Sequence, residues 1–359
     1  MVRALYLHVG TAKSGTSALQ RAVRDSAPAL RAAGIGAPII DRSQLMRRLL
    51  GPLGWRAGSG FTQRVDVERI RRIQSAFRRT PGDLLFLSCE DLADAGAGPI
   101  RVLREVLDEV DLDIRPIVSG RSWARQIPSD YQQLVQAGLT VTYDDFLEQV
   151  RTRSGTAGER FWRRQSLPEV AANWGAVSAD GAVDVVCVPS YGEDPRALYR
   201  LFAEIVGFSV SDLTIPGGTI NASFGVVEVE LFRRVNALLK DRLPSYADDY
   251  RPAVRRPLLR QGVLKRSASA RLELPFEALG WVRARGDHDV AALRASGHRL
   301  HGDSGSLVAT DGDGGEVPVA GDAELAGAAV EALAQLALAA HNDRTALAAE
   351  IARLKAAAQ

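Results

Sequence analysis

The chain has 359 residues, of which 46% are hydrophobic and 25% are charged, and its formal net charge is +2. These values are typical of a globular protein with material for one large core or two smaller ones. So small a net charge argues against attraction of the whole surface to nucleic acid or to an anionic membrane, and any basic site must be local. Cys89 and Cys187 lie far apart inside apolar runs, which predicts two small core residues and neither a disulfide framework nor a metal-ligand cluster.

The first ten residues form a short apolar run that leads into a glycine-containing loop, and this pattern predicts a first β-strand and no signal peptide. Further along, no run approaches the roughly 18 uninterrupted apolar residues of a membrane span. From these two patterns we expect a cytoplasmic protein without a membrane span.

Residues 1–220 alternate short apolar runs with helical patterns, which is the signature of β-α-β units around a mostly parallel sheet. The apolar runs predict strands at 4–9, 84–88, 114–119 and 183–188. Helical spacing of apolar residues predicts helices over 14–31, from Pro99 to about 110, over 124–136, and from Pro195 to a stop at Gly207. The stretches 41–80 and 139–180 give no clear pattern.

Beyond residue 220 the pattern becomes helical and then irregular. An amphipathic helix is predicted at 226–240, an Arg- and Pro-rich stretch follows at 250–274, a Gly- and Asp-rich loop lies at 302–315, and Ala- and Leu-rich helices begin near 322. We therefore expect three parts: a core at 1–220, a helical or irregular continuation of the same domain at 221–301, and a linker with terminal helices at 302–359. The terminal helices are a candidate surface for packing or for self-association.

The loop after the first predicted strand has the composition of an anion site. Residues 10–17 read Gly-Thr-Ala-Lys-Ser-Gly-Thr-Ser and pass directly into a helix, so backbone amides and the positive end of the helix dipole converge. The spacing is close to that of a nucleotide P-loop, but Lys13 stands two residues before the second glycine. A plain connecting turn and an ordinary nucleotide loop are the alternatives.

The run from Lys13 to Ser17 resembles the 5′-phosphosulfate-binding loop of sulfotransferases that use 3′-phosphoadenosine-5′-phosphosulfate (PAPS), whose usual pattern is Pro-Lys-Ser/Thr-Gly-Thr-Thr/Ser. Ala12 replaces the usual proline, which removes rigidity but no hydrogen-bond donor. The resemblance covers roughly residues 4–210. It implies a three-layer P-loop-type α/β fold, PAPS as co-substrate, and a donor-binding loop made of Lys13, Ser14, Gly15, Thr16 and Ser17.

A second match lies after the predicted strand at 114–119. In the same family, an arginine just after a strand and a serine eight residues later hold the 3′-phosphate of PAPS, and Arg121 and Ser129 have this spacing. A planar guanidinium suits the task because it donates two hydrogen bonds to a phosphate. Read alone, Arg121 would be a surface residue.

Glu90 follows the predicted strand at 84–88, and a carboxylate shielded from water can accept the proton of an attacking acceptor. Family members use a glutamate or a histidine as this base, so the resemblance allows Glu90 or His8, and we favour Glu90. A helix N-terminus or a magnesium ligand in a kinase would equally explain Glu90. Asp91 is predicted to be a helix cap.

Taken together, these residues predict transfer of the sulfuryl group of PAPS to a hydroxyl or amine of a carbohydrate or small molecule, giving 3′,5′-ADP and needing no metal. Lys13 and Glu90 would be catalytic, and residues 14–17 with Arg121 and Ser129 would bind the donor. The alternatives are a small-molecule kinase using ATP and magnesium, and an inactive binding protein of the same fold.

Overall fold

The computed structural model describes residues 3–39, 41–57, 59–189, 194–215, 224–259 and 269–357. Its contacts divide the chain into two compact units. The first comprises residues 1–130, 143–221 and 273–316, and the second comprises residues 131–142, 222–272 and 317–359. Residues 273–316 thus belong to the first unit, and residues 131–142 belong to the second.

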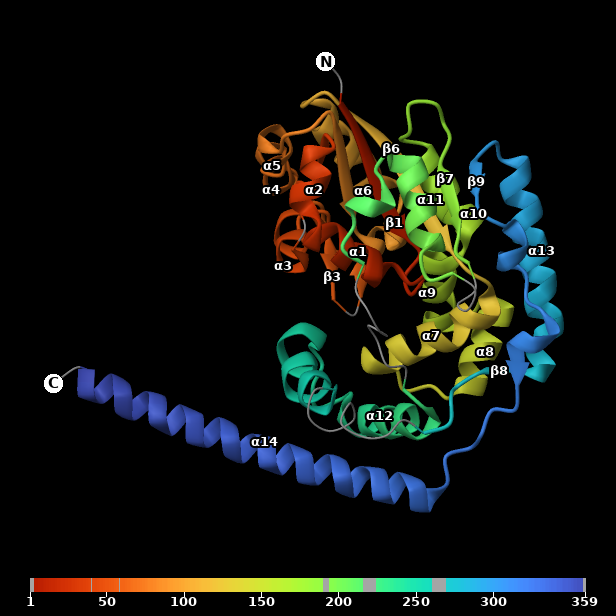
Figure 1. Ribbon diagram of the computed structural model, residues 1–359. Helices are drawn as coiled ribbons and strands as arrows, with labels where there is room; N and C mark the ends of the chain where they lie inside the picture. The colour runs from red at the N-terminus through yellow and green to blue at the C-terminus, as the bar shows by residue number, and fades with distance from the viewer. Residues whose placement is uncertain are drawn as a thin grey trace. The chain divides into compact units, whose positions relative to one another are not determined.

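A six-stranded sheet forms the centre of the first unit, with strand order β2-β5-β1-β6-β7-β9 (Figure 1). All five of its strand pairings are parallel. Since the carboxyl ends of parallel strands share one edge, the segments that follow β1, β5 and β6 emerge side by side. The bounds of the strands are β1 Arg3–Gly10, β2 Ile35–Gly36, β5 Leu84–Ser88, β6 Leu112–Gly120, β7 Asp184–Cys187 and β9 Arg299–His301.

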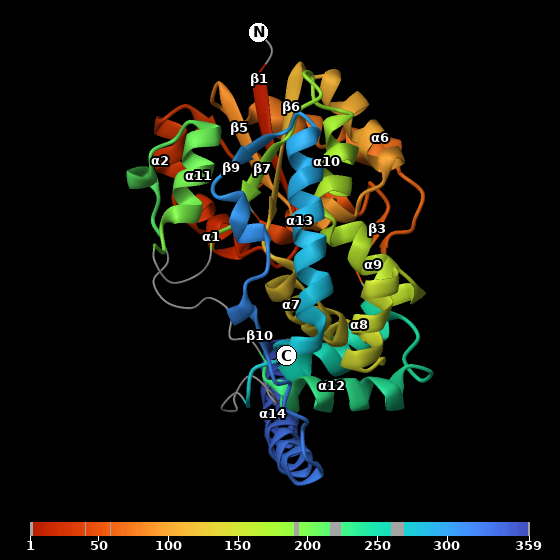
Figure 2. The same cartoon turned by 90° about the vertical axis from the view of Figure 1, so that its right-hand side faces the viewer.

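Helices cover both faces of this sheet, which gives three layers (Figure 2). One face packs against α1, α2 and α11, and the other packs against α6, α10 and α13. Shorter helices lie between these elements. The bounds are α1 Thr16–Asp25, α2 Ala27–Ala32, α3 Arg42–Leu45, α4 Val67–Arg71, α5 Gln74–Arg79, α6 Ala97–Asp108, α7 Trp123–Gln136, α8 Tyr143–Thr152, α9 Gly155–Gln165, α10 Leu167–Gly175, α11 Ala197–Val206 and α13 Leu279–Ala295. Two small pairs of strands accompany them: β3 Trp55–Arg56 with β4 Gly60–Phe61, and β8 Leu274–Pro275 with β10 Gly314–Gly315.

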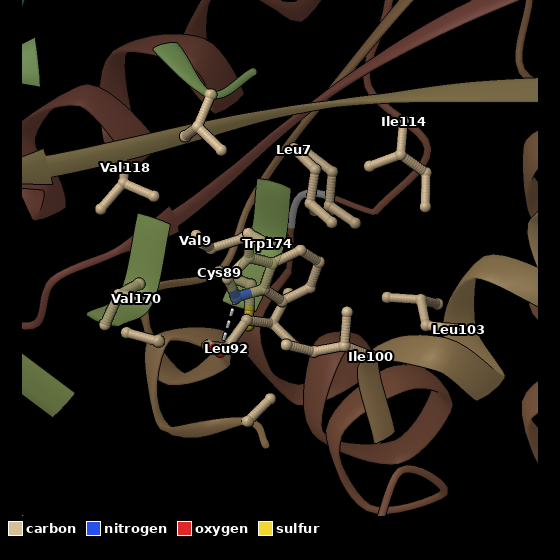
Figure 3. Packing of buried hydrophobic residues seen from close by; sticks show 14 of the residues in the cluster. Leu7, Val9, Cys89, Leu92, Ile100, Leu103, Ile114, Val118, Val170 and Trp174 are labelled. Atoms are coloured by element: carbon tan, nitrogen blue, oxygen red, sulfur yellow. Dashed lines mark hydrogen bonds between the residues drawn. The ribbon is translucent and has the colours of Figure 1, made fainter. Parts of the chain in front are cut away.

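Successive side chains of a strand point to opposite faces of the sheet, so the sheet contributes to two hydrophobic cores, one on each face. In β1, Leu5, Leu7 and Val9 point to the α6 and α10 side, whereas Ala4 and Tyr6 point to the α1 and α11 side. Figure 3 shows the first of these cores around the indole of Trp174 from α10. Cys89 and Cys187 are both free and buried there, as predicted, and burial raises the pKa of each thiol.

In the second unit, α12 (Val226–Leu239) packs against α14 (Asp322–Ala357). The buried side chain of Asn236 secures α12: its amide donates to the carbonyl oxygens of Val135 and Leu139 at 2.7 and 2.9 Å, and its oxygen accepts from Tyr250. Such a bridge satisfies backbone carbonyls at the end of α7.

The C-terminal helix α14 runs for 36 residues, so the several terminal helices expected from the sequence are one. Among the described residues, it is the helix long and apolar enough to cross a membrane by length and composition alone. The sequence prediction of no membrane span looked for an uninterrupted apolar run, and the charged residues within α14 interrupt it.

Candidate functional site

The loop between β1 and α1 turns through three left-handed residues. Gly10 has φ +103°, Lys13 has φ +66°, and Gly15, the N-cap of α1, has φ +84°. A side chain in this region is strained, and such strain concentrates at binding sites. Left-handed positions also fold backbone amides into a concavity that suits an anion. Because Gly15 has no side chain to cap α1, the first-turn amides and the positive helix dipole face this concavity.

Gly10 allows the segment after β5 to approach the loop. A Cβ atom at position 10 would lie 3.0 Å from the carbonyl oxygen of Glu90 and 3.1 Å from its Cα. A side chain here would therefore be strained in its own φ and would also push the Glu90 backbone away. The glycine expected from the loop motif thus also positions Glu90.

Glu90 begins a 3₁₀ turn that ends at Asp94, and its largely buried carboxylate faces the loop. The hydroxyl of Thr16 donates to its Oε2 at 3.1 Å. Burial, followed by the negative charge of Asp91, raises the pKa of Glu90, while the positive charges of Arg42 and Lys13 oppose this rise. The result is a carboxyl group of raised pKa beside the loop lysine, which suits a proton acceptor.

Contacts on either side hold the turn that carries Glu90. The indole of Trp174 donates to the carbonyl oxygen of Leu92 at 3.3 Å (Figure 3). Asp91, which the sequence predicted as a helix cap, instead forms an ion pair with Arg42 at 2.7 Å. The N-cap of this turn is Cys89, and its side chain forms no capping hydrogen bond. Because Arg42 is the first residue of α3, its ion pair with Asp91 links α3 to the turn.

A chain of hydrogen bonds lies beneath the loop and joins three strands. The hydroxyl of Ser14 donates to the Thr11 carbonyl at 2.7 Å and shares a hydrogen bond with Ser119 at 2.9 Å. The two ring nitrogens of His8 bond Ser119 at 2.8 Å and Ser88 at 2.7 Å. Ser14 is fully buried, so its side chain shapes the loop from below while its backbone amide remains part of it.

His8 is enclosed, and burial lowers its pKa to about 3. Both ring nitrogens already have partners, and the ring stacks edge-on against Phe202 of α11 at 5.0 Å. A buried neutral imidazole with both nitrogens engaged fits a structural bridge better than a base. Of the two bases that the family resemblance allows, this geometry favours Glu90.

Arg121 follows β6 at the same edge of the sheet, next to the loop. Its Nε donates to the side-chain oxygen of Gln126 at 2.9 Å, and the amide of Gln126 donates to the carbonyl of Ala12 within the loop. Gln126 therefore bonds both proposed anion-binding elements. Ser129 lies on α7 three residues after Gln126, so the two share one helix face.

Gln126 continues into a buried polar network. Its amide also donates to Gln165 at 2.9 Å, Gln165 donates to Asp130 at 3.0 Å, and Arg164 pairs with Asp130 at 3.4 Å. All four side chains are buried. Buried networks of this kind rigidify what they connect, and here they connect α7 and α9 to the loop.

The structure thus brings Lys13, Ser14, Gly15, Thr16, Ser17, Glu90 and Arg121 to one edge of the sheet, and it places Ser129 on the adjoining helix. Sequence reasoning missed Gln126, Asp130, Arg164 and Gln165. One signal was available: Gln126 and Asp130 are spaced four apart in a helix that also carries Trp123, Ile127 and Leu134, so polar groups occupy a buried face.

Other features lie away from this edge. A cavity of about 580 Å³ opens at the amino ends of β6, β7 and β9, where Asp184 bonds both Arg299 and His301. It is at the opposite edge of the sheet from the loop. Within the described residues, no cluster of three or more His, Cys, Asp or Glu side chains could hold a metal ion. Residues 260–268 of the Arg- and Pro-rich stretch at 250–274 fall outside the described residues.

No family model, no curated protein and no solved structure matches this chain. Arguments about function therefore depend on the site itself.

Proposed function

We propose that the chain is a sulfotransferase that takes the sulfuryl group from PAPS. The support is a loop with left-handed residues at a helix N-terminus and a lysine inside it, a guanidinium at the same sheet edge, and a carboxyl group of raised pKa in the turn after β5. By the family resemblance, residues 13–17 bind the 5′-phosphosulfate of PAPS, and Arg121 and Ser129 bind its 3′-phosphate.

The observation that carries the proposal is the double contact of Gln126. One side chain bonds Arg121 and the loop carbonyl of Ala12. PAPS has phosphate groups at two ends of one ribose, so a protein that binds it needs two anion sites at a fixed separation. A buried bridge between Arg121 and the loop supplies that fixed relation.

In the proposed reaction, the acceptor hydroxyl or amine attacks sulfur in line with the bond to the 5′-phosphate. The new bond joins acceptor and sulfur, and the bond that breaks joins sulfur to the phosphate oxygen, which keeps the electron pair. Glu90 takes the acceptor proton, and Lys13 with the amides of α1 stabilises the charge on the departing 3′,5′-ADP. The acceptor is a carbohydrate or a small molecule.

A small-molecule kinase is the second candidate, and the contact between Thr16 and Glu90 favours it. A hydroxyl in the first turn of the loop helix and a carboxylate after a neighbouring strand are the groups that hold magnesium in many phosphoryl-transfer enzymes. The position of Lys13 inside the loop argues for the sulfotransferase. An inactive binding protein is disfavoured because the Glu90 carboxylate faces the loop.

Calorimetric titration of the full chain with 3′,5′-ADP, beside ATP with magnesium and beside 5′-ADP, tests the proposal. We expect 3′,5′-ADP to bind without metal and more tightly than 5′-ADP. Lys13→Ala and Arg121→Ala should each weaken binding by about 10- to 100-fold, since each removes a charge-assisted contact.

Arg115→Ala is the matched control. Arg115 lies on β6, the strand that precedes Arg121, but its side chain bonds Tyr6 and Asp113. This substitution should leave the affinity unchanged. Tighter binding of ATP with magnesium would replace the sulfotransferase with the kinase, and equal binding of 3′,5′-ADP and 5′-ADP would remove the role of Arg121.

A further inference from the structure

Exposed apolar side chains form a stripe along α14. Its larger members form two groups spaced by three or four residues, Val330 with Leu333, and Leu347 with Ile351 and Leu354, and they are between 44% and 67% exposed. Ala337 and Ala340 continue the spacing, and Arg344 stands in the middle. With Val330 at position a of a heptad, the stripe occupies a (330, 337, 344, 351) and d (333, 340, 347, 354) over nearly four heptads.

The contact between α12 and α14 uses a different face of α14. The buried residues of the helix are Leu325, Ala328 and Ala332, which occupy positions c and f of the same heptads. Positions c and f form the outer face of a coiled coil, opposite the a and d seam. The packing within the second unit therefore leaves the stripe uncovered and is compatible with a partner helix on it.

We propose that this stripe joins a second copy of the chain in a parallel two-stranded coiled coil. The a positions include the β-branched residues Val330 and Ile351, and the d positions are mainly leucine, a combination that favours parallel dimers. Arg344 occupies an a position near the middle of the stripe, where a charged residue costs stability. A two-stranded coiled coil tolerates it because the side chain can reach water beside the seam, and a polar residue at such a position disfavours higher oligomers.

The charges beside the seam also suit a parallel partner. Glu350 occupies g and Lys355 the following e, and in a parallel pair a g residue faces the e residue five positions later on the other helix. Asp343 at g similarly adjoins Arg344 of the other copy. Within its own helix, Glu350 bonds Arg353 at 2.6 Å, so the partner lysine would add a second cation to that carboxylate. An antiparallel pair would separate Glu350 from Lys355.

A membrane is the competing partner, because α14 is long and apolar enough for one. Only its first half fits a membrane, whereas the stripe continues into the second half, where Asp343, Arg344, Glu350, Arg353 and Lys355 are distributed around the helix and are exposed. Placing these charges in hydrocarbon is unfavourable, whereas a coiled coil leaves most of them in water.

Light scattering during gel filtration of the full chain at micromolar concentration tests the proposal. We expect twice the chain mass of 38.6 kDa. Leu347→Glu, at a d position, should raise the dimer dissociation constant at least about tenfold, and dilution should then give monomer. Leu338→Glu is the matched control, because Leu338 is also exposed, at 55%, but occupies position b. It should remain dimeric.

A cysteine cross-link tests the orientation, and the buried Cys89 and Cys187 leave the background low. Ile351→Cys should give a disulfide-linked dimer on mild oxidation, since equal positions meet only in a parallel seam, and Leu338→Cys should not. A monomeric wild-type chain, equal weakening by Leu347→Glu and Leu338→Glu, or a dimer without the Ile351→Cys cross-link would each overturn the proposal. So would flotation of the monomer with phosphatidylcholine and phosphatidylglycerol vesicles, which would assign the stripe to a membrane.

Discussion

Glu90 has two properties that oppose each other. It lies largely buried beside Asp91, which is unfavourable for a carboxylate, and it faces Lys13 and the N-terminus of α1, which is where the proposed reaction needs a proton acceptor. Residues held in such positions reduce stability in exchange for function.

Glu90→Gln is expected to stabilise the protein at neutral pH and to slow transfer. Because the folded-state pKa of Glu90 is raised, the protonated form favours folding below the ordinary glutamate pKa, and this contribution is lost as pH rises through the folded pKa. Glutamine is never charged, so it avoids that loss and can still accept from Thr16. Urea denaturation at pH about 7 measures the first effect, and release of 3′,5′-ADP measures the second, a decrease of about 10²- to 10⁴-fold.

Glu105→Gln on the exposed surface of α6 is the control and should change neither quantity. A less stable Glu90→Gln variant would contradict the burial argument. An unchanged transfer rate would contradict the role as base, and the two results are independent.

His8 should make the fold sensitive to acid. With a pKa of about 3 in the folded chain and an ordinary value of 6.5, the folded state binds fewer protons between these values, so stability is full above pH 6.5 and falls as the pH is lowered. The loss reaches about 3 kcal/mol by pH ~4. His8→Gln, which cannot be protonated there, should show a flatter decline in urea denaturation across this range, whereas His341→Gln on the exposed part of α14 should follow the wild type. Parallel declines for all three proteins would show that His8 titrates normally.

At the scale of elements, the site depends on β1 lying between β5 and β6. This order places the turn with Glu90 on one side of the loop and the start of α7, with Arg121 and Gln126, on the other. The loop is therefore held from both sides, by the close approach of Gly10 to Glu90 and by the bond from Gln126 to Ala12.

Gln126→Ala is expected to weaken 3′,5′-ADP binding roughly tenfold, although Gln126 itself need not contact the nucleotide. Its loss leaves the Ala12 carbonyl and the Nε of Arg121 without this bridge, so the two anion sites are no longer fixed relative to each other. Calorimetry with 3′,5′-ADP measures the effect. Gln165→Ala, which removes only the far partner of Gln126, should cause a smaller loss; an equal loss would mean that the buried network, and not the bridge to the loop, sets the affinity.

Prediction of elements from the sequence succeeded where a segment's own residues decide its structure. The strand at 84–88 was predicted with its observed bounds, and β1, β6, β7, α11 and α12 were predicted to within two residues at each end. The helix predicted over 14–31 is instead two helices that meet at Ser26, because Pro28, in the first turn of the second, lacks the amide that would continue the first. The missed helices α8, α9 and α10 lie in 139–180, where buried polar residues such as Arg164 and Gln165 obscure the apolar spacing.

At the scale of the whole molecule, residues 273–316 belong to the same unit as the N-terminal strands. β9 is three residues long and extends the sheet next to β7, and α13 packs against α10. Arg299 and His301 hold β9 through Asp184 of β7, with distances of 2.9 and 2.8 Å. A strand this short has no periodicity of its own, so only its partner reveals it.

The second unit differs in how it is built, because it buries one face of α14 and leaves the a and d stripe exposed. Exposed apolar stripes of this regularity mark interaction surfaces. A parallel dimer would therefore complete the second unit without requiring any change in the fold of the first, where the candidate site lies.

The sequence by itself determined the features that depend on neighbouring residues: the glycine loop after β1, the alternating apolar strands, and the residues that end up at the loop edge. Glycine conformations, helix starts and strand alternation are local, so the residue order is sufficient to predict them. Only the tertiary structure decided that Glu90 and Arg121 lie on opposite sides of the same loop and that Gln126 bridges Arg121 to it. It also decided that β9 forms the edge of the sheet beside β7. These relations arise from pairing between segments tens of residues apart, where the packing of the whole core selects one arrangement among many.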